Sequence, residues 1–194
     1  PGEYVALVGS NGSGKTTLVN LVGRFYDPTS GTVLIDGKSA KDYPVRQLRE
    51  NIAMVMQDVF LFSDTIEDNI AFGNPQVDRS YIQQMARIAD ADGFITSMPQ
   101  GYDTIVGERG VGLSGGQKQR ISLARALAKD PAILILDDTT SAVDMETESK
   151  IQQELLGLTE NKTTFIIAHR ISSVRDADLI LMMEKGQVVE QGTH

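Results

Sequence analysis

The sequence contains no cysteine, no apolar run long enough to cross a bilayer, and no excess of basic residues. The absence of cysteine excludes disulfide bonds and thiolate metal sites. A membrane-spanning helix needs about 20 consecutive apolar residues, and no stretch approaches that length. The formal net charge of −8 argues against non-specific nucleic-acid binding, which needs a basic surface to neutralise phosphates. If the chain serves a membrane, it does so through a partner or through another segment.

The chain has the size and composition of one globular domain. Its 194 residues are 41% hydrophobic and 23% charged, which is ordinary for a folded core. Residues 1–4 lack the basic segment of a signal peptide. Both ends run directly into apolar strand patterns without the usual polar margin, so we expect an N-terminally truncated piece of a longer protein. The sequence has no internal repeat and no low-complexity tract.

Apolar runs alternate with helical periods along the chain, a pattern typical of an α/β domain with a mostly parallel sheet. The predicted strands are residues 4–8, 32–35, 53–56, 133–136, 163–168, 179–183 and 187–190. The run 133–136 has no polar alternation. We therefore expect both of its faces to be buried, as in a central strand.

Helical patterns occupy two parts of the sequence. The first helix is predicted to begin in a glycine-rich loop and to carry one apolar stripe, formed by Leu18, Leu21, Val22 and Phe25. Beyond about residue 65 the strand signal disappears, and helical periods dominate as far as about residue 129. The sequence thus predicts an α/β core formed by 1–57 and 131–194, with a helical subdomain inserted at 58–130.

The glycine-rich segment after the first strand matches the phosphate-binding pattern G-x-x-x-x-G-K-[ST]. It consists of Gly9, Ser10, Asn11, Gly12, Ser13, Gly14, Lys15 and Thr16. Its glycines let successive backbone N–H groups point at phosphates, and the following helix adds its positive end. We expect Lys15 to reach the β and γ phosphates and Thr16 to bind magnesium. The alternative, a plain glycine-rich turn, is disfavoured by the strand before the loop and the helix after it.

Polar or loop residues follow four of the predicted strands. They are Gly9, Gln57, Asp137 with its neighbour Asp138, and His169. In a parallel sheet, ligand chemistry gathers at the carboxyl ends of the strands, so we expect these residues to converge at one edge. A carboxylate after a buried strand can hold magnesium, and His169 would lie near the γ phosphate. The alternatives are solvated loop carboxylates and a histidine with a structural role.

The segment Leu113-Ser114-Gly115-Gly116-Gln117 resembles the signature motif of ATP-binding cassette (ABC) proteins, and Lys118-Gln119-Arg120 continues in the manner of that family. Ser114 and the two glycines open a predicted helix that ends near Lys129. They offer a hydroxyl and bare N–H groups at its positive end, which makes a second anion site. The resemblance covers nearly the whole chain and implies the ABC ATPase fold, a P-loop NTPase core with a helical subdomain.

The resemblance implies that two such domains sandwich two MgATP molecules in a head-to-tail dimer, each signature closing over the nucleotide of the other. It adds further site residues to those already named. These are Thr17 beside the phosphate loop, Gln57 as the Q-loop glutamine that senses magnesium, Asp144 in the D-loop 141–144, and His169 as the switch histidine. The nucleotide contacts it implies therefore include Ser114, Gly115, Gly116 and Gln117 as well as the phosphate loop.

Two segments resemble those of exporters: Gly107-Glu108-Arg109-Gly110, which is similar to the X-loop, and the run 60–66 after Gln57. The resemblance therefore implies an exporter motor that hydrolyses ATP and contacts a transmembrane domain. Such a domain would lie on the cytoplasmic face of the cell membrane. A soluble ABC ATPase that does not act in transport is the alternative, but this chain has no long coiled-coil insertion, basic face or tandem cassette.

Asp138 departs from the family pattern, which usually has glutamate as the general base at this position. Aspartate is one methylene shorter, and a displacement of roughly 1 Å can cost on the order of a hundredfold in rate. We therefore expect the chain's own site to bind ATP and to hydrolyse it slowly, as in the degenerate half of a heterodimeric exporter. The intact signature fits a heterodimer. The presence of His169 fits it less well, because this histidine is often altered in degenerate halves, so a homodimer is the alternative. A regulatory cassette with little turnover is a further alternative.

Overall fold

The structure is a computed structural model that describes residues 2–107, 110, 112–137, 139, 142–159, 161–168 and 173–194. The chain forms two compact units, which are considered separately. The first unit comprises Pro1–Ala53, Pro131–Asp137 and Asn161–His194. The second comprises Met54–Asp130 and Asp138–Glu160.

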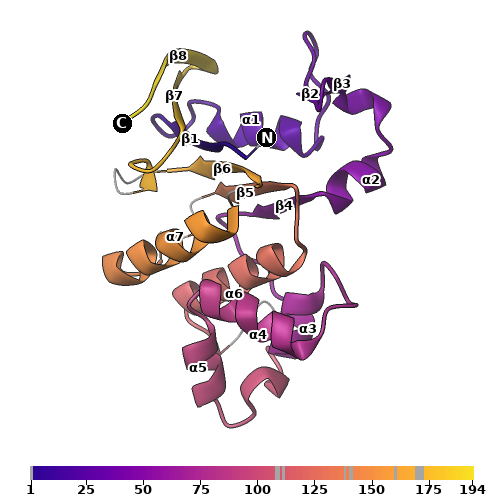
Figure 1. Cartoon of the computed structure of the whole chain (residues 1–194), viewed down its shortest axis with the longest axis vertical. Helices are drawn as coiled ribbons and strands as arrows, with labels where there is room; N and C mark the ends of the chain where they lie inside the picture. The colour runs from indigo at the N-terminus through magenta and orange to yellow at the C-terminus, as the bar shows by residue number, and fades with distance from the viewer. Residues whose placement is uncertain are drawn as a thin grey trace. The chain divides into compact units, whose positions relative to one another are not determined.

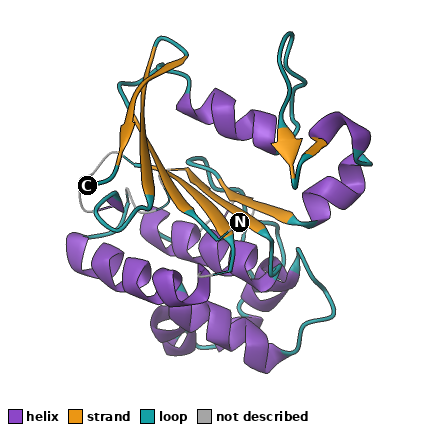
Figure 2. Cartoon of the chain, turned by 45° about the horizontal axis from the view of Figure 1, so that its top comes forward, coloured by secondary structure: helices purple, strands orange, loops and turns teal. Residues whose placement is uncertain are grey.

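A six-stranded sheet in the order β4-β5-β6-β1-β7-β8 forms the centre of the α/β fold (Figures 1 and 2). Its strands are β1 (Tyr4–Val8), β4 (Ile52–Val55), β5 (Ile133–Asp137), β6 (Thr163–Ile167), β7 (Leu179–Glu184) and β8 (Gln187–Gly192). The pairs β5–β6, β6–β1 and β1–β7 are parallel, and β8 pairs antiparallel with β7. The predicted α/β fold with a mostly parallel sheet is confirmed.

The register of the central strands places their carboxyl ends at one level. Ile167 of β6 lies opposite both Leu7 of β1 and Asp137 of β5. The side chains of Leu134 and Ile135 are fully buried although they point to opposite faces of the sheet. This confirms the expectation that the run 133–136 is buried on both faces.

The predicted first helix is correct in position but ends earlier than its apolar stripe suggests. Helix α1 (Lys15–Val22) ends at its C-cap Gly23, and Arg24 then adopts a positive φ of 51°, which turns the chain away from the helix axis. Phe25 therefore leaves the apolar stripe and is 52% exposed, with the Arg49 guanidinium 4.8 Å from its ring centre.

The strand predicted at 32–35 is shorter than expected and lies outside the main sheet. Only Leu34–Ile35 is extended (β2), and it pairs antiparallel with β3 (Lys38–Ser39) in a separate two-stranded sheet. Asp36 and Gly37 link the two strands, both with positive φ, which is the conformation of a tight hairpin turn. A short 3-10 helix (Ala40–Asp42) and α2 (Val45–Glu50) follow.

The second unit is helical, and α6 lies at its centre. Its helices are α3 (Ile66–Ala71), α4 (Arg79–Ile88), α5 (Asp92–Ser97), α6 (Gly115–Ala128) and α7 (Met145–Thr159). Helix α6 packs against α3 and α4 through buried side chains such as Ile121 and Leu123. By its contacts α7 groups with these helices, whereas the sequence division had placed it in the α/β core.

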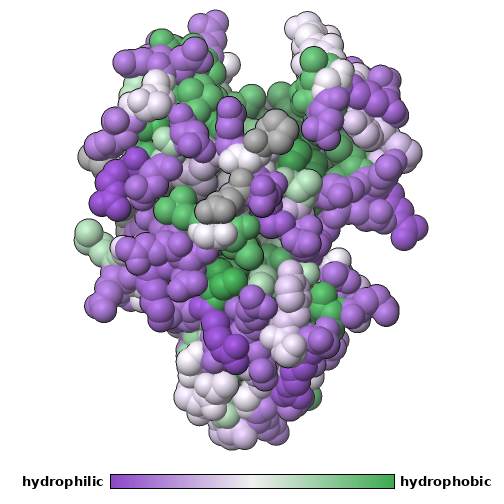
Figure 3. Space-filling model, viewed as in Figure 1, coloured by the Kyte–Doolittle hydropathy of each residue, from purple (hydrophilic) through white to green (hydrophobic). Residues whose placement is uncertain are grey.

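The surface is mixed in polarity. Hydrophobic residues appear in patches among hydrophilic ones on the face drawn in Figure 3. Within the described ranges, every helix is too short or too polar to span a bilayer.

Candidate functional site

The phosphate-binding pattern forms a loop between β1 and α1 whose shape is fixed by contacts at both of its ends. Gly9 has a φ of +151°, and a Cβ built there would lie 2.3 Å from the carbonyl oxygen of Met183. Ser13 donates its N–H to the Ser10 carbonyl at 3.1 Å and accepts from the N–H of Gly186 at 2.9 Å. The turn between β7 and β8 therefore holds the loop in place.

Lys15 is only 6% exposed and lies inside this loop. Its ammonium group donates to the carbonyls of Gly9 and Ser10, both at 2.9 Å, and to the Ser13 hydroxyl at 3.3 Å. Gly14 caps the N-terminus of α1, where the first backbone N–H groups have no partner within the helix. A cation held beside free N–H groups at a positive helix end forms an anion site.

A hydrogen bond joins the start of α1 to the end of β5. The Thr16 hydroxyl donates to Asp137 Oδ2 at 3.1 Å, and Asp137 is 5% exposed. Hydroxyl and carboxylate oxygens are ligands that magnesium prefers, and the ion usually takes its other ligands from phosphates and water. The described residues contain no group of three His, Cys, Asp or Glu side chains that could hold a metal by themselves. The oxygen atoms of Thr16 and Asp137 thus fit a magnesium ion that is bound together with a phosphate ligand.

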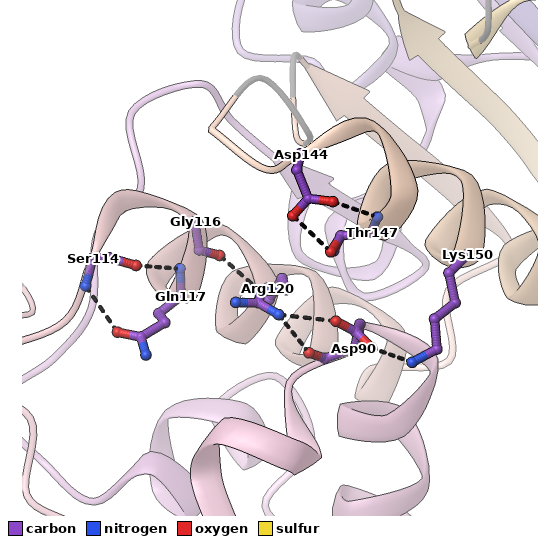
Figure 4. Close-up of polar contacts among 8 residues, drawn as sticks. All are labelled: Asp90, Ser114, Gly116, Gln117, Arg120, Asp144, Thr147 and Lys150. Carbon is purple, nitrogen blue, oxygen red and sulfur yellow. Dashed lines mark hydrogen bonds and ion pairs between the residues drawn. The ribbon is translucent and has the colours of Figure 1, made fainter.

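Ser114 caps the N-terminus of α6, as the sequence predicts. Its hydroxyl accepts from the N–H of Gln117 at 3.2 Å, and Gln117 Oε1 accepts from the N–H of Ser114 at 2.9 Å (Figure 4). This reciprocal pair fixes the first turn of the helix. Ser114 and Gly115 are exposed, so the positive end of α6 is open to a ligand.

The segment that contains Asp144 packs directly against the signature motif. A Cβ at Gly116 would lie 2.8 Å from the carbonyl oxygen of Ala142, and Gln119 Oε1 accepts from the N–H of Ala142 at 3.1 Å. Asp144 directly precedes α7 and accepts from the N–H and hydroxyl of Thr147, both at 2.9 Å (Figure 4). These hydrogen bonds lower the pKa of Asp144. The two motifs therefore form one constellation within the second unit.

Other predicted site residues fall elsewhere. Gln57 is exposed, follows β4 and belongs to the second unit. On the phosphate loop and the start of α1, Asn11, Gly12, Thr16 and Thr17 are exposed. Asp138 and His169 lie outside the described residues, as do Glu108, Arg109 and Ser141, so their roles stay predictions.

Sequence reasoning missed a charged cluster beside the signature motif. The guanidinium of Arg120 donates to the carbonyl of Gly116 at 3.3 Å and to both the backbone carbonyl and the carboxylate of Asp90 at 2.9 Å (Figure 4). Lys150 of α7 donates to the other carboxylate oxygen of Asp90. The helical period could have predicted the contact of Arg120 with Gly116, which lies one turn away. Nothing in the sequence indicates Asp90.

Comparison with known proteins agrees with these motifs. The family model described as ABC transporter matches residues 1–141. The chain is 55% identical over 193 residues to YgaD of Bacillus subtilis strain 168, whose name describes it as a putative multidrug export ATP-binding/permease protein. It is 53% identical over 193 residues to a protein of the same description, SAB1799c, from Staphylococcus aureus strain bovine RF122 / ET3-1. Each alignment covers 100% of this chain and 33% of the relative.

A solved structure shares the fold throughout. A bacterial Atm1-family ABC exporter with ATP bound superposes with a TM-score of 0.96 and 45% identity, over 100% of this chain and 34% of that chain. The chain thus spans about a third of the length of the proteins that it matches.

We expect Gly9→Ala to destabilise the first unit by about 2 kcal/mol or more, because the new methyl group meets a backbone carbonyl and the φ disfavours a side chain. Urea denaturation measures the change. Gly157→Ala is the control, since a Cβ there meets nothing within 4 Å. Equal unfolding free energies for the Gly9→Ala variant and the wild type would contradict the described close approach.

We expect Gly116→Ala to lower the free energy of unfolding by about 1 kcal/mol, although alanine normally favours a helix. The methyl group would force the Ala142 carbonyl to move. Gly93→Ala in α5 has free space around the added carbon, so it should stabilise the chain by about 0.5 kcal/mol. The two substitutions change the unfolding free energy in opposite directions only if the signature and the 142–144 segment pack as described.

Proposed function

Because the chain belongs to the ABC transporter family, we propose that it is the ATP-binding and ATP-hydrolysing motor domain of an ABC exporter. One observation carries the proposal. The phosphate loop encloses the Lys15 ammonium, while the Thr16 hydroxyl and the Asp137 carboxylate meet beside it at 3.1 Å. That arrangement suits a triphosphate with a bound magnesium ion. The names of the relatives, which describe export, support the transport role.

In this proposal the backbone N–H groups of the loop and Lys15 bind the β and γ phosphates of ATP. Thr16 and Asp137 hold Mg²⁺, which offsets negative charge on the phosphate oxygens when it is bound. Asp137 is nearly buried, and its hydrogen bond with Thr16 keeps both oxygen atoms oriented before a ligand arrives. Such preorganisation reduces the cost of arranging charges at the moment of reaction.

Hydrolysis is an in-line attack of water on the γ phosphorus, which breaks the bond to the β-phosphate oxygen and releases ADP and phosphate. Asp138 takes a proton from the water, His169 contacts the γ phosphate, and Gln57 senses the metal. The open N-terminus of α6, with Ser114 and its glycines, binds the γ phosphate held by a second ABC domain. Binding of ATP then closes the dimer, and product release reopens it.

We infer that the site built on this chain's own phosphate loop turns over slowly, because Asp138 is shorter than the glutamate usual in the family. The capping box of Ser114 and Gln117 is complete, which suits a signature that serves a competent site on a different partner. We therefore favour a heterodimer. If Asp138 permits no useful turnover, the domain is a regulatory ATP-binding cassette.

The transmembrane partner would bind an exposed aromatic cluster in the second unit. Phe60 and Phe72 are 53% and 59% exposed and contact the ring of Phe62 between them, at centroid distances of 5.2 and 4.2 Å. Exposed aromatic groups of this kind are typical of protein interfaces. Contact with a transmembrane domain there would hold the chain on the cytoplasmic face of the cell membrane.

Arg125 of α6 supports this cluster from below the surface. Its guanidinium lies 5.4 Å from the ring centre of Phe62 and donates to the carbonyls of Phe60 and Asn69 at 2.8 and 2.7 Å. Burial lowers the pKa of Arg125 to about 10, so it stays charged at neutral pH. Helix α6 thus carries the signature motif at its start and contacts the aromatic cluster through Arg125 near its end.

Asp138→Glu and Lys15→Ala test the ATPase proposal. We expect weak phosphate release from the purified wild-type chain with MgATP, a rise of about tenfold or more in Asp138→Glu, and loss of nucleotide binding in Lys15→Ala. Steady-state phosphate release and binding of a fluorescent ATP analogue measure these effects.

Brisk wild-type turnover that Asp138→Glu leaves unchanged would overturn the slow-site and heterodimer part of the proposal. Tight ATP binding without turnover in either protein, even with a competent partner domain, would favour the regulatory cassette over the motor.

Phe72→Ala tests the partner surface. We expect it to reduce transport-coupled ATPase activity about fivefold in the assembly with its transmembrane domain, and to leave nucleotide binding by the separate chain unchanged. Phe25→Ala is the matched control, because Phe25 is similarly exposed, at 52%, but belongs to the first unit. Equal losses in both variants would show that the aromatic cluster has no special role.

A further inference from the structure

The signature motif and Asp144 stand at the starts of two helices that touch each other little. Helix α6 begins at Gly115 and α7 at Met145, and these helices make few direct contacts, whereas α4 packs against both. Near the motifs, Ala142 and Val143 lie close to Gly116, and the side chain of Gln119 accepts from the N–H of Ala142. These contacts fix the segment before α7, and a second connection joins the helices themselves.

Asp90 supplies that connection. It follows the C-cap of α4 and has a positive φ of 53°, a conformation that aspartate tolerates better than most residues. Its backbone carbonyl and its carboxylate both accept from Arg120 of α6, and its other carboxylate oxygen accepts from Lys150 of α7 (Figure 4). One side chain therefore joins the end of α4 to the helices that follow both motifs.

The contacts on the α6 side are the stronger ones. The side chains of Arg120 and Asp90 are only 20% and 22% exposed, and the guanidinium also lies 4.9 Å from the ring centre of Phe94. A charge-assisted hydrogen bond in such a place is stronger than one in water. Arg120 additionally donates to the carbonyl of Gly116, so the position of its guanidinium is linked to the first turn of the signature helix.

The contact on the α7 side is more exposed, and it is attractive because Asp90 carries a negative charge. The side chain of Lys150 is 63% exposed, which makes its ion pair weak by itself. Its hydrogen bond with Asp90 raises the pKa of Lys150. Without the Asp90 carboxylate, Arg120 and Lys150 would lose the negative charge that both contact, which would weaken the connection between α6 and α7.

We propose that Asp90 is a positioning residue that sets the spacing between the signature motif and Asp144, so that both reach the nucleotide held by a facing domain together. This inference rests on the proposed function, in which the two motifs act across a dimer. It assigns no direct contact with nucleotide to Asp90. Its effect should therefore appear in ATP-driven pairing of domains rather than in binding of ATP to one chain.

Two substitutions of Asp90 are compatible with its positive φ and distinguish the contribution of its charge from that of its hydrogen bonds. Asp90→Gly accepts the positive φ and keeps the backbone carbonyl, but removes both ion pairs. Asp90→Asn also tolerates this conformation and keeps a side-chain acceptor, but loses the charge. Asp92→Asn is the control, because it makes the same change of charge two residues away, where the carboxylate contacts Arg87 and Tyr102 instead.

The first measurement is hydrogen–deuterium exchange of segments 114–120 and 142–150 in the chain without nucleotide. We expect exchange to rise at least threefold in both segments in Asp90→Gly and less in Asp90→Asn, with no change in Asp92→Asn. The second is the MgATP concentration that half-saturates pairing with a competent ABC domain, measured by sedimentation. It should rise about fivefold in Asp90→Gly, while the Kd of the single chain for ATP stays within twofold.

Unchanged exchange in both segments of Asp90→Gly would overturn the inference. Equal losses of pairing and of single-chain ATP binding would also overturn it, because they would indicate general destabilisation. If the wild-type chain neither pairs nor hydrolyses ATP while exchange still rises in Asp90→Gly alone, the proposed function fails and the positioning role within the second unit stands.

Discussion

The hydrogen bond between Thr16 and Asp137 depends on three strands that end at the same level, and the proposed nucleotide site is built around that bond. The two residues are 121 positions apart in the sequence, and the shared register of β5, β6 and β1 brings them together. A buried carboxylate is costly without a hydrogen-bond partner, so this contact also stabilises the end of β5. Pairing of these strands therefore also brings the two oxygen atoms together.

Most of the fold and the local structure of two candidate site segments could be predicted because each depends on local chemistry. The unbroken apolar run 133–136 indicated a buried strand, and the glycine loop before Lys15 had the strand and helix that its pattern requires. Ser114 and the two glycines after it were expected to open a helix, and α6 begins there. In all three cases, residues close in the sequence determine the structure, so the sequence predicts it without knowledge of distant contacts.

The errors and omissions arise where distant contacts or backbone turns decide the outcome. Phe25 fits a helical stripe, yet Gly23 ends the helix and Arg24 turns the chain before the stripe reaches it. The cluster around Asp90 joins residues that are 30 and 60 positions apart. No periodic pattern encodes such a pairing, because it follows from how α4, α6 and α7 pack.

The position of β1 in the sheet has a consequence for synthesis of the chain. Its two neighbours are β6 and β7, which begin at Thr163 and Leu179, and the phosphate loop after β1 is held by Gly186. A ribosome makes the N-terminal end first, so β1 leaves it long before either partner strand exists. The apolar residues of β1 stay without these native neighbours until residues 163–184 have been made. During that interval the apolar residues of β1 are exposed to non-native contacts, so the phosphate loop is ordered late in synthesis.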